Sequence, residues 1–190
     1  MVQLLERKQQ DQWIVQSNIS WKRFKQIKEG FTGCRNLRLF YLDGTVEILT
    51  VSPEHEIYKS IIGMLIEIFL VELGIEFVPT GSMDMERENA AAAQGDESYC
   101  LGEQKAIPDL VVEVVFSSGG PSKLARYAVL GVGEVWFWED GLFSVYCLRE
   151  AGYEKVSQSE LLPKMDFELL TRCVLMNSRV EAARAFRAAL

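Results

Sequence analysis

The sequence predicts a single mixed α/β domain, and three observations lead to this prediction. The 190 residues, 48% hydrophobic and 25% charged, are enough for one globular domain with a sizeable core. Apolar stretches at 108–116 and 134–138 flank a helical pattern at 121–130, a strand–helix–strand unit that implies a parallel pair with a right-handed crossover. Asp-Gly turns at 43–44 and 140–141 add antiparallel strands, so the sheet should be mixed.

The amino-terminal part predicts an arm, a basic helix and a hairpin. Residues 1–17 are polar, with weak helical character. Ser20 is placed to cap a basic amphipathic helix at 21–28, whose apolar side chains face inward. Two strands, at 37–42 and 46–49, follow around the first Asp-Gly turn.

A central helix comes next. Ser52 and Pro53 form a strong helix start, and the apolar pattern runs to Leu73 before Gly74 ends it. Because this segment is apolar nearly all round, we expect it to be packed on all sides.

The remaining chain predicts short strands around the strand–helix–strand unit. Residues 89–95 include four consecutive alanines, and we expect a mobile loop there that could contact substrate. Gly131 should close the helix at 121–130. Trp136 and Trp138 are interpreted as core or dimer surface, not as base-stacking platforms. The other expected elements are strands at 75–78, 83–87, 96–101, 142–148 and 153–156, a helix at 166–176 and a tail helix from 179.

Charge is unevenly distributed along the chain. The formal net charge of −7 argues against a general polyanion binder. Up to Leu42, however, there are eight Lys/Arg against three Asp/Glu, and from Asp43 onward twelve against twenty-four. The basic face of the helix at 21–28 is therefore either a solvated surface or a phosphate-contacting one.

Cysteine usage and hydropathy point to the cytoplasm. The four cysteines are scattered without a CxxC pair, which argues for reduced thiols and against a zinc site or a disulfide framework. No apolar run is long enough to span a bilayer, and residues 1–8 lack the hydrophobic core of a signal peptide. We expect no membrane association.

The feature that points to chemistry is Glu113, a lone carboxylate in the apolar run at 108–116. Burying an unpaired carboxylate costs several kcal/mol, so Glu113 needs a cation or hydrogen-bond donors. A bound metal and an ordinary paired or edge-facing glutamate are both open. Asp96 begins the preceding strand, and neighbouring strands can bring two carboxylates to one divalent cation, Mg²⁺ or Mn²⁺. With a lysine nearby, this set supports metal-assisted phosphodiester hydrolysis, although the spacing alone is weakly specific.

Four motifs stand out in the sequence: Ser52-Pro53-Glu54-His55-Glu56, Asp96-Glu97-Ser98-Tyr99, the run from Pro108 to Gly120, and Lys123-Leu124-x-x-Tyr127-x-x-x-Gly131-Val132-x-Glu134-Val135-Trp136-Phe137. Together they resemble the Uma2 family (DUF820), a large group of restriction endonuclease-like proteins abundant in cyanobacteria. The resemblance covers about 19–176 and is most specific between Pro108 and Trp138. It implies the restriction endonuclease-like PD-(D/E)xK nuclease fold, a mixed β-sheet flanked by helices with an acidic site at one end of the sheet.

The resemblance assigns Asp96 as the metal-binding aspartate and Glu113 as its acidic partner. Gly95 stands where the family has a proline, which should not affect ligation. Val115 replaces the lysine expected two residues after the glutamate. Lys123, on the next helix, is the natural migrated substitute, and Lys105, which we expect within a strand, is a weaker competitor.

Three further residues need separate treatment. His55, the only histidine, lies in the first turn of the central helix, where a neutral ring could be an acceptor, a general base or a ligand, or could simply pin the helix entry. The resembling pattern includes it, together with Glu47 as a third carboxylate. Asp109 shares a strand face with Glu113 but lies roughly 13 Å away, so a turn or strand-entry role is favoured.

Two classes of function follow. The leading hypothesis is a Mg²⁺- or Mn²⁺-dependent endonuclease acting on DNA as a homodimer, with Asp96, Glu113 and Lys123 at its centre. The alternative is a catalytically silent scaffold or interaction protein with the nuclease fold, because fold does not fix function. A nuclease acting on RNA or single-stranded DNA is a third hypothesis. We expect an arm at 1–17, the domain at 18–178 and a helical tail at 179–190.

Overall fold

The computed structural model describes residues 12–34, 37–116 and 123–190, and two β-sheets organise them. The five-stranded sheet has the order β1-β3-β2-β6-β5, and the six-stranded sheet the order β11-β10-β9-β8-β7-β4. The strands are β1 (Gln12–Gln16), β2 (Leu37–Leu42), β3 (Thr45–Thr50), β4 (Phe77–Pro79), β5 (Asp84–Arg87), β6 (Ala91–Gln94), β7 (Glu97–Leu101), β8 (Leu110–Val115), β9 (Glu134–Glu139), β10 (Leu142–Arg149) and β11 (Gly152–Val156). The helices are α1 (Trp21–Gly30), α2 (Pro53–Glu72), α3 (Leu124–Leu130), α4 (Phe167–Val174) and α5 (Arg179–Ala188).

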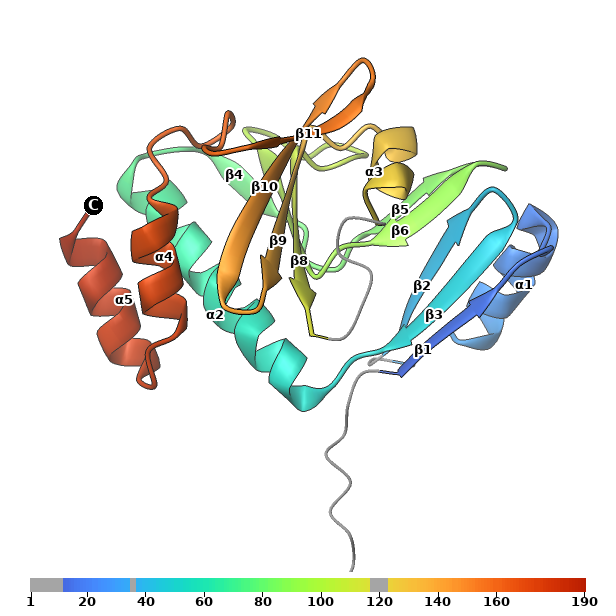
Figure 1. The fold of residues 1–190 in the computed structure, drawn as a ribbon, viewed down its shortest axis with the longest axis horizontal. Coiled ribbons are helices and arrows are strands. Elements are labelled where there is room, and N and C mark those ends of the chain that lie inside the picture. The colour runs from blue at the N-terminus through green and yellow to red at the C-terminus, as the bar shows by residue number, and fades with distance from the viewer. Residues whose placement is uncertain (1–11, 35–36, 117–122) are drawn as a thin grey trace, which may run out of the picture.

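The five-stranded sheet is antiparallel throughout and carries α1 on one face. Ser20 caps α1 as predicted, because its hydroxyl accepts a hydrogen bond from the Arg23 N–H. Phe24 is fully buried and packs with Tyr41 and Val46 of the sheet. Figure 1 shows this sheet and α1 together at one side of the molecule.

The six-stranded sheet contains the predicted parallel pair, β8 and β9, connected through α3. All six residues of β8 are buried, as expected for a strand covered on both faces. The central helix α2 begins at Ser52 and Pro53, and it packs with α4 and α5 against this sheet (Figure 1). The mixed α/β class is confirmed, with the strands divided between two sheets instead of one.

Two local predictions were wrong. Residues 12–16 form strand β1, not part of a weakly helical arm, while 1–11 lie outside the described residues. Residues 91–94 form strand β6, not a mobile loop: it pairs with β2 and β5, and Ala91, Ala92 and Ala93 are buried. The alanines fit there because α3 packs against β6, where larger side chains would hold the helix away.

The tryptophan strand β9 belongs to the core. Trp136 is fully buried and Trp138 is 3% exposed, so of the two interpretations, core or dimer surface, both tryptophans fit the core. The tail helix α5 also contributes to the core through Phe186. Among residues 12–34, 37–116 and 123–190, no helix has both the length and the apolar character needed to cross a bilayer.

Candidate active site

Asp96 and Glu113 lie opposite each other at one end of the β7–β8 pair. The register pairs Glu97 with Val112, so one step further places Asp96, which directly precedes β7, across from Glu113. The Asp96 N–H also donates to the Val112 carbonyl over 3.2 Å. Asp96 is 2% exposed and Glu113 1%. The sequence prediction that adjacent strands bring these carboxylates together is therefore consistent with the observed register.

Two side chains at the start of α3 hold the Glu113 carboxylate. The Lys123 ammonium donates to Oε2 over 2.6 Å, and the Tyr127 hydroxyl donates to Oε1. Positions 123 and 127 are four apart, which places both on one helix face. Burial raises the pKa of Glu113; Lys123 opposes this rise and the negative charge of Asp96 adds to it, leaving the pKa above its usual range.

The Asp96 carboxylate is held by α2 and by β8. Its Oδ2 accepts from the Val114 N–H over 2.8 Å and lies 3.1 Å from His55 Nε2. Burial alone raises the pKa of Asp96, but His55, Lys123 and the Val114 N–H together bring it below its usual range.

His55 is fully buried, and its Nε2 atom is a hydrogen-bond donor. This nitrogen is 3.1 Å from Asp96 Oδ2 and 3.1 Å from the Val114 carbonyl oxygen. Because both neighbours are acceptors, Nε2 carries the hydrogen. The expectation of an acceptor or general base does not fit this nitrogen, and His55 instead joins the helix entry to Asp96.

Glu47, expected as a third carboxylate, contacts different partners. Its Oε2 accepts from Arg126 Nη2 over 2.9 Å and from the Trp13 indole N–H over 3.3 Å. The guanidinium of Arg126 lies 4.4 Å from the centre of the Phe40 ring, and Lys123 lies over the same ring at 5.7 Å. Within the described ranges, no three His, Cys, Asp or Glu side chains are arranged to hold one metal ion.

Lys105 and Asp109 form a separate pair at the other end of β8. Lys105 Nζ lies 2.6 Å from Asp109 Oδ2, which also accepts from the Leu101 N–H over 2.7 Å. Asp109 thus has the strand-entry role that was favoured. Lys105 lies in the loop between β7 and β8 and not within a strand as expected, so Lys123 is the lysine that contacts the candidate site.

Two residues of α3 were not assigned from the sequence. Arg126 is 2% exposed and binds Glu47, and Tyr127 is fully buried against Glu113. The spacing of Lys123 and Tyr127 was a usable signal, since four positions along a helix put two donors on one carboxylate. Arg126 gave no such signal, because its partner lies 79 positions away.

Gly95, at the position where the resemblance led us to expect a proline, is enclosed. A Cβ at this position would lie 2.7 Å from Val111 Cγ1 and 3.3 Å from the Glu97 carbonyl oxygen. The residue before Asp96 therefore approaches β8 too closely to carry a side chain unless Val111 moves.

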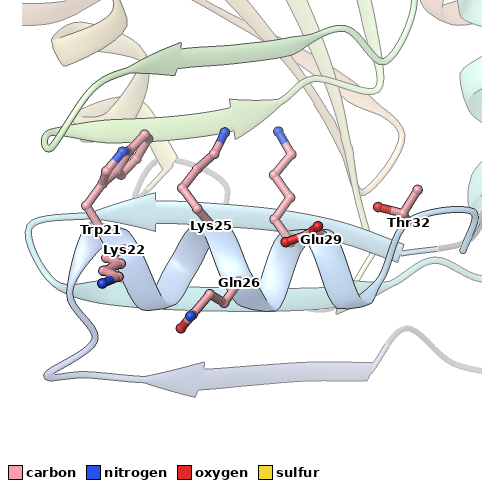
Figure 2. Close-up of a pocket in the computed structure, with 7 residues that line it drawn as sticks. Trp21, Lys22, Lys25, Gln26, Glu29 and Thr32 are labelled. Atoms are coloured by element: carbon pink, nitrogen blue, oxygen red, sulfur yellow. The ribbon is translucent and has the colours of Figure 1, made fainter.

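The basic face of α1 is partly neutralised. Lys25 and Lys28 each lie 2.7 Å from Glu86 of β5, and Lys28 also lies 3.0 Å from Asp84. An open hollow of about 630 Å³ runs along this helix, and Figure 2 shows Lys25 directed toward the green strands β5 and β6 and Lys22 directed away from those two strands. This face is less positive than the sequence alone implied.

Comparison with known proteins identifies the family of the chain. The Uma2 family, described as "Putative restriction endonuclease", matches residues 21–174. The chain belongs to the Uma2 family. A solved structure of a putative nuclease belonging to DUF820, from Anabaena variabilis ATCC 29413, is similar at 13% identity and a TM-score of 0.47, covering 78% of this chain and 90% of that one. No curated protein matches significantly.

Proposed function

We propose that this Uma2 protein is a metal-dependent endonuclease of the PD-(D/E)xK type that hydrolyses DNA phosphodiester bonds. One observation carries the proposal: Asp96 and Glu113 oppose each other on neighbouring strands, and the Lys123 ammonium lies 2.6 Å from Glu113. The family description supports a nuclease.

The donor set suits a hard divalent cation. Mg²⁺ commonly takes only one or two carboxylates from the protein and completes its shell with water and substrate phosphate oxygens. Asp96 and Glu113 would supply those carboxylates, and burial, with the negative charge of Asp96 adding to it, raises the pKa of Glu113. Mg²⁺ or Mn²⁺ bound there would polarise the phosphoryl oxygens and make a bound water more acidic.

The chain's own residues have distinct roles in this proposal. Lys123 places a positive charge beside Glu113, where it would offset the charge that develops on the phosphate during attack by water. His55 and the Val114 N–H fix one oxygen of Asp96. Tyr127 fixes one oxygen of Glu113, so both carboxylates are oriented before substrate arrives.

Two observations favour the alternative, a catalytically silent scaffold with the nuclease fold. Both oxygens of Glu113 already accept hydrogen bonds from the protein. His55, Asp96, Glu113 and Lys123 are each no more than 6% exposed. A buried, paired carboxylate of this kind also occurs as a purely structural ion pair.

Nicking of supercoiled plasmid with Mg²⁺ or Mn²⁺ separates the two. We expect the wild type to nick, and Asp96→Asn, Glu113→Gln and Lys123→Met each to lose activity by about 10²-fold or more. Asp109→Asn is the matched control, since this carboxylate pairs with Lys105 at the far end of β8 and should keep full activity. Parallel reactions on single-stranded DNA and RNA define the substrate.

An inactive wild type on all three substrates would contradict the nuclease proposal and favour the scaffold. Undiminished nicking by Asp96→Asn would show that the activity does not come from this site. Circular dichroism of each variant excludes loss of fold as the cause of a lost activity.

A further inference from the structure

The five-stranded sheet ends in an exposed, uncharged strand. Within the described part of the chain β1 pairs only with β3, and all five of its residues are exposed. Trp13 is 43% exposed, Ile14 60% and Val15 49%. Figure 2 shows β1 as the outermost strand of the sheet, beyond α1. Such an edge presents a row of N–H and C=O groups to any strand that can approach it.

The other sheet edges carry the features by which proteins prevent strand pairing, and β1 does not. Natural edge strands are protected by charged side chains, by proline or by being very short. These features are Asp84, Glu86 and Arg87 in β5, Glu154 and Lys155 in β11, and Pro79 in the three-residue β4. The sequence of β1, Gln-Trp-Ile-Val-Gln, contains neither a charge nor a proline.

The order of residues in β1 is self-complementary. In an antiparallel pair centred on Ile14, Ile14 opposes Ile14 of the partner subunit, Trp13 opposes the partner's Val15, and Gln12 opposes the partner's Gln16. Aromatic and β-branched cross-strand pairs stabilise sheets, and here no pair opposes like charges. A centre on Ile14 is compatible with either hydrogen-bonding phase, because a two-fold axis can pass through both kinds of antiparallel residue pair.

We propose that the outer edge of β1 pairs with β1 of a second copy of this chain, joining two five-stranded sheets across a two-fold axis. The interface is isologous, as in most homodimers. A five-residue strand pair buries less surface than the roughly 1,200 Å² of a standard stable interface, so the association is weak and concentration-dependent.

The proposed interface also adjoins the candidate site. The Trp13 indole donates to Glu47, which binds Arg126 three positions after Lys123. Pairing of β1 would therefore hold in place the strand that contacts the Arg126–Glu47 ion pair. The partner subunit itself would contribute no residue to the site. The proposal does not depend on nuclease activity.

Sedimentation velocity of the full chain over a concentration series tests the proposal. We expect a reversible monomer–dimer equilibrium for the wild type. Ile14→Lys should be monomeric throughout, because two lysines would then face each other across the axis. Val71→Lys is the matched control: Val71 is 62% exposed on α2, away from the edge, and its replacement should leave the dimer intact.

A charge-swap mixture tests the register. Ile14→Glu alone should also be monomeric, whereas an equimolar mixture with Ile14→Lys should recover the dimer. A wild type that stays monomeric at the highest concentration overturns the proposal, even if β1 pairs with some other strand. A dimer that persists in Ile14→Lys, or a mixture that fails to associate while both variants are folded by circular dichroism, overturns it as well.

Discussion

Replacing Lys123 by methionine would leave the Glu113 carboxylate buried without the ammonium that contacts it. The two groups are 2.6 Å apart, and their side chains are 8% and 2% exposed. Removing one partner of a buried ion pair typically destabilises a protein by about 3 to 5 kcal/mol. The protein can limit this cost by protonating Glu113.

That limit can be worked out from the pKa of an ordinary glutamate, 4.5. Protonating such a carboxyl at pH 7 costs about 3.4 kcal/mol, at 1.36 kcal/mol per pH unit. At pH 5 the same step costs below about 1 kcal/mol. Because the folded variant keeps its proton while the unfolded chain loses it above pH 4.5, the variant's stability falls as pH rises.

Urea denaturation of the metal-free protein at pH 5 and pH 7 measures this effect. We expect Lys123→Met to lose about 3 kcal/mol at pH 7 and below about 1 kcal/mol at pH 5. The double variant with Glu113→Gln removes both charges and should recover most of the loss. A cost under about 1 kcal/mol at both pH values would refute the account of Glu113 as a carboxylate neutralised by Lys123.

Two other predictions follow from contacts around Asp96. Gly95→Ala should lower the free energy of unfolding, measured in urea, by about 1 to 3 kcal/mol, because the new Cβ meets Val111. The same substitution should cost less in a Val111→Ala protein, and an equal cost with and without Val111 would contradict the close approach. Burial raises the pKa of Glu97 from 4.5 to about 7. Between these pH values the folded protein keeps a proton that the unfolded chain has released, so the free energy of unfolding should fall as pH rises from about 4.5 through 7. Urea titrations should show a shallower fall for Glu97→Gln, and an unchanged slope would contradict this assignment.

The sequence predicted most elements of the fold because local signals agreed with packing. Ser20 and Ser52 cap α1 and α2 where expected, and the spacing at 108–138 gave the parallel pair β8–β9. The failures were β1 and β6. β6 is mostly alanine, so its strand state comes from tertiary pairing. β1 did carry a local signal, because Trp13, Ile14 and Val15 favour strands, but the polar residues around them led to the prediction of an arm.

The candidate site was predictable where strand register governs it. Asp96 and Glu113 could be placed on adjacent strands, and Lys123 at the start of the next helix, from the order of elements alone. The partners of His55 and Glu47 could not, because Asp96, Val114 and Arg126 reach them through long-range packing. Whether a histidine nitrogen donates or accepts depends on such partners.

Calorimetric titration with Mn²⁺ tests most directly whether Asp96 and Glu113 share a divalent cation. The account predicts one binding event per chain for the wild type and for Asp109→Asn, and none for Asp96→Asn or Glu113→Gln. A folded wild type that binds no Mn²⁺ at millimolar concentration would contradict it, as would undiminished binding by Asp96→Asn.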